Sequence, residues 1–159
     1  MKFHTAETDI RSLAIKALSS FFFVGYIPFA SGTFGSLAAF LLYFFVIPDD
    51  IYVLSGVSIF LIIIAIYLSS KAEILFNKKD PSEVVIDEVA GYFIAVLFLP
   101  KSLINGAIAF VFFRIFDIFK PYPANLIDEK MGGGCGVVFD DVIAGIYANA
   151  AAQILTRLL

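Results

Sequence analysis

Long apolar segments alternate with short polar segments along most of this chain. The clearest apolar segment, Ile51–Ser70, holds twenty residues without a charge, about the length of helix that crosses ~30 Å of hydrocarbon. Before it lies Phe34–Ile47, and the turn Pro48-Asp49-Asp50 between the two is typical of a connection between antiparallel helices. The pattern therefore predicts helices that span a membrane.

Three further apolar segments follow, each bounded by a charged or helix-breaking residue. They are Val89–Leu99, Ser102–Phe113 and Val142–Leu155. The last is rich in alanine and glycine, which favours close packing between helices. The glycine- and proline-rich segment Lys120–Gly136 predicts a loop. Several of these segments are shorter than twenty residues, so spans built on them must include flanking residues or thin the bilayer locally.

The N-terminal part has a weaker pattern. Residues 1–12 are expected to form a polar tail. The next segment, Leu13–Phe29, is apolar but is interrupted by Gly25 and Pro28. This segment fits a short span, a re-entrant segment or an interfacial helix. Taken together, the segments predict an all-α membrane bundle of about four to six helices, forming a single domain over residues 1–159.

Composition supports the membrane assignment. Sixty per cent of the residues are hydrophobic and the mean hydropathy is +0.93, whereas soluble domains are about 45–50% apolar. The length leaves no room for a second core. The net charge of −3 argues against nucleic acid as a partner.

Lysine and arginine residues give the predicted bundle an orientation. If the polar segment after Ile51–Ser70 is cytoplasmic, the inside set is Lys71, Lys78, Lys79, Arg114, Lys120 and Lys130, and the outside pair is Lys101 and Arg157. This imbalance satisfies the positive-inside rule. The same orientation brings four polar segments to the cytoplasmic face: Ser31–Ser36, Asp80–Glu88, Arg114–Lys120 and Asp128–Asp141.

Acidic residues are concentrated beside the apolar segments. Nine of the fourteen lie between Asp80 and Asp141. A carboxylate at the mouth of a membrane helix is costly to desolvate unless it is paired, hydrated or bound to a cation. The concentration therefore predicts chemistry at the membrane surface that involves a divalent metal.

Two of the four segments fit either ligand binding or plain structure. Ser31–Ser36 fits a phosphate-binding helix start, but an ordinary N-cap explains it better when it is taken alone. In Asp80–Gly91, residues Asp87 and Gly91 share a helix face, so Gly91 leaves space beside Asp87 for a metal or a neighbouring helix. A solvated acidic helix start suits Glu83 and not Asp87-Glu88, because a long apolar run follows at once.

The other two segments carry cations and glycines. Arg114, Asp117 and Lys120 form one polar stripe on a helix, which suits either snorkelling to the headgroups or phosphate binding by the two cations. In Gly132–Asp141, a glycine run that can approach a phosphate precedes two adjacent carboxylates that are expected to start a helix.

Carboxylates with hydroxyls and water suit Mg²⁺, a hard cation that bridges to substrate phosphate. The chain lacks the residues that cysteine- and histidine-dependent phosphatases and zinc sites need. Cys135 has no arginine at the spacing of a cysteine phosphatase loop, and the single histidine, His4, argues against a zinc site or a histidine-dependent phosphatase.

The motifs resemble, in order, those of the bacterial phosphatidylglycerophosphatase A family. They are Gly32-Thr33-Phe34-Gly35-Ser36, Asp87-Glu88 with Gly91, Arg114 through Pro123, Asp128, and the glycine-rich segment that runs into Asp140-Asp141 and Gly145. The resemblance extends from about residue 13 to the C-terminus. The chain departs from the usual family residues at Ser31, Phe34, Phe119, Tyr122 and Gly132.

The resemblance implies a multi-pass enzyme of the bacterial cytoplasmic membrane that acts in phospholipid biosynthesis. With Mg²⁺, it would hydrolyse the terminal phosphomonoester of phosphatidylglycerophosphate at a cytoplasmic-face site. Asp87, Glu88, Asp140 and Asp141 are expected to supply most metal ligands, with Asp80 and Asp128 as further candidates. Arg114 and Lys120 are expected to bind the phosphate, supported by Thr33 and Ser36. Asp117 fits a ligand, a base or a brace for Arg114.

Three other functions fit the sequence less well. A lipid phosphotransferase of the CDP-alcohol type would carry a D-G-x-x-A-R motif, which this chain lacks. A cation transporter would place acids near the middle of its spans, whereas these lie at the ends. A membrane scaffold would not need the glycine-rich segment.

Overall fold

The computed structural model describes the backbone of residues 2–158 and the side chains of residues 9–158, and over this range it contains helices and turns but no strand. The elements are α1 Lys2–Ser19, the 3-10 helix η1 Val24–Tyr26, α2 Ser31–Phe45, α3 Ile51–Phe76, α4 Ile86–Ala95, α5 Leu103–Phe119, α6 Ala124–Lys130 and α7 Gly133–Leu158. The predicted all-α class is confirmed. The short helix α6 lies within Lys120–Gly136, the segment that was predicted to be a loop.

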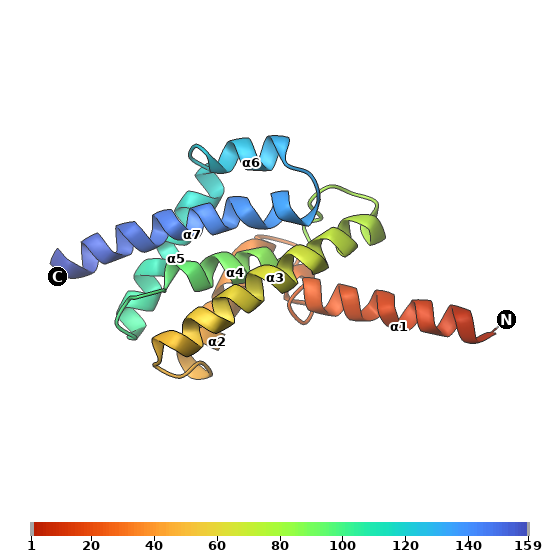
Figure 1. Cartoon of the computed structure of the whole chain (residues 1–159), viewed down its shortest axis with the longest axis horizontal. Helices are drawn as coiled ribbons and strands as arrows, with labels where there is room; N and C mark the ends of the chain where they lie inside the picture. Colours follow the sequence, from red (N-terminus) through yellow and green to blue (C-terminus); the bar gives the residue numbers. More distant parts are fainter. Residues whose placement is uncertain (1, 159) are drawn as a thin grey trace.

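Helix α4 is the centre of the bundle. Eight of its ten residues are buried, and it packs against α2, α3, α5 and α7 (Figure 1). Ten residues rise only about 15 Å, far less than the hydrocarbon thickness. The helix ends inside the protein because the Asn149 amide of α7 donates to the carbonyls of Ala95 (3.0 Å) and Leu97 (2.6 Å).

Helices α3 and α7 have 26 residues each, and both are long and apolar enough to cross a membrane. The outer face of α3 exposes large apolar side chains such as Ile59, Phe60 and Ile63. A row of exposed apolar side chains of this kind suits contact with lipid. The shorter helices α2 and α5 stay predictions as membrane spans.

The N-terminal segment 13–29 is two pieces rather than one span. Helix α1 ends at Ser19, after which Phe21, Phe22 and Phe23 have positive φ values of 46°, 56° and 69° and lead into η1. This reversal brings the chain back to the start of α2. Helix α1 projects from one end of the molecule (Figure 1). Because α1 begins at Lys2, the segment 1–12 that was predicted to be a polar tail is helical from Lys2. The side chain of His4 lies outside the described residues.

Helix α7 begins earlier than the sequence predicts. It starts at Gly133, so Asp140 and Asp141 lie about two turns inside the helix and not at its start. The cause is the packing of Gly134 on α3: a Cβ there would collide with the Ile66 carbonyl, and the Gly134 N–H donates to the Ser70 hydroxyl (3.0 Å). The glycine run therefore serves a helix crossing in this structure.

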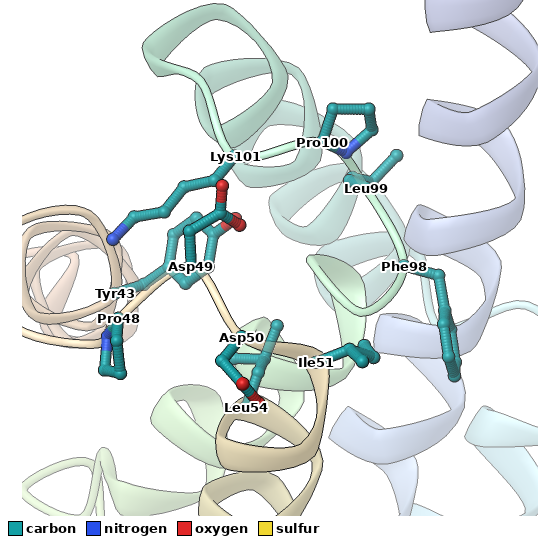
Figure 2. A pocket seen from close by; sticks show the side chains of 10 residues that line it. All are labelled: Tyr43, Pro48, Asp49, Asp50, Ile51, Leu54, Phe98, Leu99, Pro100 and Lys101. Atoms are coloured by element: carbon teal, nitrogen blue, oxygen red, sulfur yellow. The ribbon is translucent and has the colours of Figure 1, made fainter.

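The alternating directions of α2, α3, α4, α5 and α7 give the bundle two different ends. At one end, a pocket of about 390 Å³ lies between the α2–α3 turn and residues 98–101 (Figure 2). There the Lys101 ammonium lies 5.5 Å from the Tyr43 ring centroid and donates to the Ile47 carbonyl. Lys101 thus ties the two connections together. The acidic residues 80–141 gather at the other end.

Candidate active site

A backbone crossing of α4 and α7 positions the acidic residues. A Cβ at Gly145 would collide with the Gly91 carbonyl, and a Cβ at Gly91 would lie 2.7 Å from the Asp141 carbonyl oxygen and 2.6 Å from the Phe113 ring. Only glycine permits so close an approach. The space beside Asp87 that the sequence indicated at Gly91 is therefore taken by neighbouring helices, and their approach brings Asp141 next to Asp87.

Three carboxylates meet at this crossing. Ligand oxygens of Asp87, Glu88 and Asp141 all lie within 4.8 Å of one another. The Asp87 and Asp141 side chains are 6% and 3% exposed. Asp87 Oδ1 and Glu88 Oε2 are buried without a hydrogen-bond partner. Buried like charges at such spacing need a proton or a cation, and an all-oxygen donor set suits a hard divalent ion such as Mg²⁺.

Asp87 and Glu88, which precede the apolar part of α4, favour their protonated forms when no cation is present. Burial raises the pKa of Asp87 well above its ordinary value, and the Glu88 charge adds to the effect. Burial also raises the pKa of Glu88, to about 7, although the hydrogen bond with Asp87 opposes the shift. Metal binding at this cluster would therefore release protons.

The metal-free protein is expected to become less stable as the pH rises from about 5 to 8. Because the Glu88 pKa is about 7 in the folded state and 4.5 ordinarily, its favourable contribution is present below the lower value and is lost through the higher one. Added Mg²⁺ should reverse the loss. Thermal unfolding in detergent with a chelator or with Mg²⁺ measures both effects, and a midpoint that rises with pH without metal would contradict this prediction.

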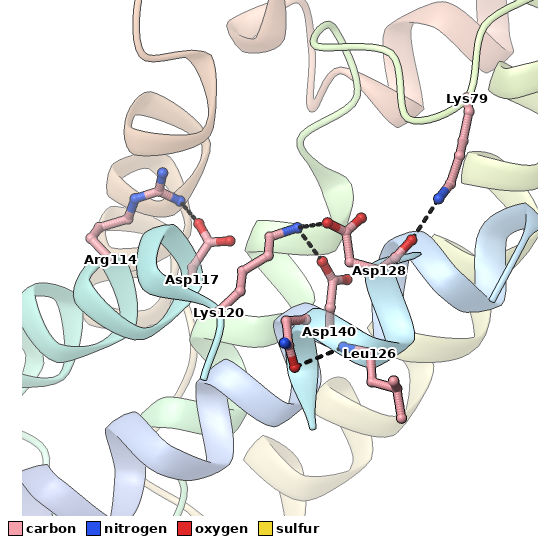
Figure 3. A network of polar contacts seen from close by, with 8 residues as sticks. Lys79, Arg114, Asp117, Lys120, Leu126, Asp128 and Asp140 are labelled. Carbon is pink, nitrogen blue, oxygen red and sulfur yellow. Dashed lines mark hydrogen bonds and ion pairs between the residues drawn. The ribbon is translucent and has the colours of Figure 1, made fainter. Parts of the chain in front are cut away.

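Lys120 binds a second group of acids, Asp128 and Asp140 (Figure 3). Its ammonium lies 2.5 Å from Asp140 Oδ2 and 3.2 Å from Asp128 Oδ2. Burial acts to lower the Lys120 pKa, but the hydrogen bond and charge of Asp140 and the charge of Asp128 outweigh it and raise the value. The other Asp140 oxygen, Oδ1, is buried without a partner. Asp140 is thus neutralised by Lys120, whereas Asp141 belongs to the cluster that it forms with Asp87 and Glu88.

Arg114 lies behind the cluster. It forms an ion pair with Asp117 and donates to the Ser36 hydroxyl (3.2 Å), which in turn donates to the Gly32 carbonyl (2.7 Å). Arg114 Nε is buried and unpartnered. Ser36 therefore orients Arg114 in this structure, and Arg114 orients Asp117.

A cavity of about 100 Å³ joins the two groups of acids. Its predicted lining residues are Asp80, Asp87, Glu88, Asp117, Lys120, Asp140 and Asp141. The lining residues that were not predicted as site residues are Ser31, Pro81, Ser82, Val84 and Val137, although Ser31 belongs to the turn that was predicted to fit a phosphate. Thr33, Ser36, Arg114 and Asp128 are outside this lining set. The four segments that were expected to meet do contribute to one region.

Replacing Gly32 by alanine is expected to weaken metal binding at least about tenfold. The new Cβ would collide with the Glu88 carboxylate and lie 3.2 Å from Arg114 Nη1, so Glu88 would have to move. Isothermal titration with Mg²⁺ measures the change. Gly132→Ala is the matched control because a Cβ there meets nothing within 4 Å. Equal affinities for the two variants would contradict the role of Gly32.

Comparisons with known proteins agree on one family. The profile of the family described as Phosphatidylglycerophosphatase A matches residues 17–156. A Haemophilus influenzae protein of that name is 39% identical over 126 residues, covering 75% of this chain and 74% of its own. The Escherichia coli protein of the same name is 34% identical over 127 residues, covering 78% and 73%.

A third relative carries a different name. A Bacteroides thetaiotaomicron protein that is provisionally named phosphatidylinositol-3-phosphatase is 35% identical over 132 residues, covering 78% of this chain and 82% of its own. No solved structure matches the chain significantly. The named relatives thus share phosphate removal from a lipid and differ in the headgroup.

Proposed function

The chain belongs to the phosphatidylglycerophosphatase A family, and from this premise we propose that it hydrolyses the terminal phosphomonoester of phosphatidylglycerophosphate to phosphatidylglycerol and inorganic phosphate. The observation that carries the proposal is the convergence of the Asp87, Glu88 and Asp141 carboxyl groups on a cavity that Lys120 also lines. A substrate phosphate is an anion, so this site needs a cation to accept it. The product would be a membrane phospholipid, and we propose that the reaction serves phospholipid biosynthesis.

Asp87, Glu88 and Asp141 would hold Mg²⁺, because their oxygens converge and two are without partners. Asp140 is the next candidate through its free Oδ1. Asp80 is exposed at the rim, and Asp128 is already bound to Lys120, so both are weaker candidates. When bound, the ion would neutralise charge on the phosphoryl oxygens and position them for in-line displacement.

The remaining residues have roles that follow from their contacts. Lys120 lines the cavity and supplies a positive charge toward the phosphate. Asp117 also lines it and is fixed by Arg114, so Asp117 can accept a proton from the attacking water. The water oxygen bonds to phosphorus, the phosphorus–oxygen bond to glycerol breaks, and the glycerol oxygen takes a proton. Arg114 and Ser36 act by holding this arrangement through their contacts, and the support expected from Thr33 stays a prediction.

Phosphate release identifies the reaction. Purified protein in detergent should release inorganic phosphate from phosphatidylglycerophosphate with Mg²⁺, lose that activity with a chelator and recover it when Mg²⁺ returns. Phosphatidylinositol 3-phosphate serves as the competing substrate because of the Bacteroides thetaiotaomicron relative. No metal-dependent phosphate from either lipid would refute the phosphatase assignment. Transfer of the phosphoryl group to an added alcohol, with no free phosphate, would favour a phosphotransferase.

The proposed location is the cytoplasmic face of a multi-pass membrane protein. Cys135 is the single cysteine, is exposed and lies in the first turn of α7. A membrane-impermeant thiol reagent is therefore expected to label Cys135 only after the cytoplasmic side is opened. A cysteine at Lys101 in a Cys135→Ser background should react from outside. Labelling of Cys135 in intact cells would reverse the orientation.

A further inference from the structure

A second cavity adjoins the acidic one. It measures about 300 Å³ and lies between the loop Gly25–Ala30 and the pair Ser82-Glu83. Ser31 and Ser82 line both cavities. The two spaces are therefore neighbours that share a wall of two hydroxyl side chains, and we name the second one the Glu83 pocket.

The walls of the Glu83 pocket are held by backbone contacts. A Cβ at Gly25 would collide with the Glu83 carbonyl and lie 3.1 Å from Val85 Cγ1. The Val85 N–H donates to the Ser19 carbonyl at 3.0 Å. The N-terminal loop is thus docked against the segment before α4, and the pocket between them is built into the fold.

The acidic cavity is the smaller of the two spaces. Its volume is about 100 Å³ and that of the Glu83 pocket is about 300 Å³, so the acidic cavity suits a phosphoryl group and the adjoining pocket suits the part of the lipid next to that phosphate. Phe29 lines the Glu83 pocket and is 67% exposed, and Phe22 and Phe23, earlier in the same connection, are 70% and 49% exposed. Exposed apolar side chains of this kind suit contact with lipid.

The chemistry of the Glu83 pocket suits an alcohol. Glu83 is partly buried, and its carboxylate accepts a hydrogen bond from the Ser82 hydroxyl at 3.4 Å. A carboxylate repels a phosphate but accepts a hydrogen bond from a hydroxyl group. A lipid headgroup with a hydroxyl-bearing glycerol between two phosphates matches this arrangement when its terminal phosphate lies in the acidic cavity.

We propose that the Glu83 pocket is the headgroup subsite, in which Glu83 accepts a hydrogen bond from the free hydroxyl of the substrate glycerol. The inference rests on the proposed function and adds a determinant of specificity to it. The glycerol is held beside Ser31 and Ser82, its terminal phosphate reaches the acidic cavity, and the diacyl part leaves past Phe29. Glu83 acts in substrate selection and not in the chemical step.

The test compares phosphatidylglycerophosphate with an analogue in which the central glycerol hydroxyl is replaced by hydrogen. Wild-type protein is expected to prefer the natural lipid in kcat/KM about tenfold, the effect of one hydrogen bond to a charged group. Glu83→Ala should remove that preference by lowering kcat/KM for the natural lipid alone. Glu83→Gln, which retains an acceptor oxygen, should restore part of the preference.

Glu129→Ala is the control, since Glu129 is an exposed acid on α6 outside both cavities. Equal wild-type activity on the two lipids would overturn the subsite while leaving the phosphatase intact. An equal loss on both lipids in Glu83→Ala would also overturn it. Absence of phosphate release by wild-type protein from phosphatidylglycerophosphate would overturn the proposed function and the glycerol assignment together. A Glu83 effect confined to phosphatidylinositol 3-phosphate would overturn the glycerol assignment alone.

Discussion

Asp141→Asn is expected to abolish metal-dependent phosphate release and at the same time to stabilise the metal-free protein. The substitution keeps the size of the side chain and removes one of three carboxylates whose oxygens lie within 4.8 Å of one another. A metal ion supplies several kcal/mol of transition-state stabilisation, and each ~1.36 kcal/mol corresponds to tenfold in rate. We therefore expect kcat to fall about 10³-fold. Relief of repulsion between buried like charges raises the unfolding midpoint without metal.

The two readouts separate a functional role from a structural one. Phosphate release and thermal unfolding are measured for each variant with and without Mg²⁺. Mg²⁺ should raise the unfolding midpoint of wild-type protein and not that of Asp141→Asn. Asp87→Asn should behave in the same way, whereas Asp49→Asn, at the opposite end of the bundle, should match wild type. Full activity of both Asp141→Asn and Asp87→Asn at every Mg²⁺ concentration would remove these residues from the metal site.

Gly145→Ala is expected to reduce both stability and activity through the backbone. The added methyl group would collide with the Gly91 carbonyl and lie 3.0 Å from the Ile94 Cβ, so α4 and α7 must separate. Overpacking of this kind destabilises proteins by about 1–3 kcal/mol. Separation also moves Asp141 away from Asp87, and a displacement of about 1 Å can lower activity about 10²-fold.

Gly56→Ala is the matched control on another long helix. Gly56 lies within α3 and a Cβ there meets nothing within 4 Å, so alanine should be neutral or favourable by up to about 1 kcal/mol. Unfolding in mixed detergent measures the stability change, and Mg²⁺ titration measures the metal affinity of the cluster formed by Asp87, Glu88 and Asp141. If Gly145→Ala matched Gly56→Ala in both measurements, the close crossing of α4 and α7 would not position the site.

The sequence predicts which segments meet, because charge bias and span count decide to which end of the bundle each connection goes. That reasoning alone placed Asp87, Glu88, Lys120 and Asp141 together. That reasoning could not predict which partner each of these side chains contacts. Asp140 and Asp141 are neighbours in sequence, but the packing of α7 against α3 and α4 decides that Asp140 contacts Lys120 while Asp141 joins the cluster.

The glycines show the same limit. A run of three glycines looks identical whether it approaches a phosphate or another helix, and in this structure Gly134 packs against Ser70. Ser31 belonged to the predicted phosphate-binding turn Ser31–Ser36, but neither Ser31 nor Ser82 was predicted as a site residue, because a serine beside a glycine or proline is typical of any turn. Their importance comes from the two cavities that they share, which is a property of packing and is not visible in spacing.

Asp141 lies eight residues after the start of α7, a rise of about 12 Å along the helix. In the proposed orientation, the reactive phosphate is therefore handled in a recess below the aqueous boundary. We expect lipid to reach the site beside the exposed aromatic loop at residues 22–29, and water to reach it from the side of Lys120 and α6. Hydrolysis in this arrangement needs two reagents that come from different phases, a lipid from the bilayer and a water molecule from the aqueous side.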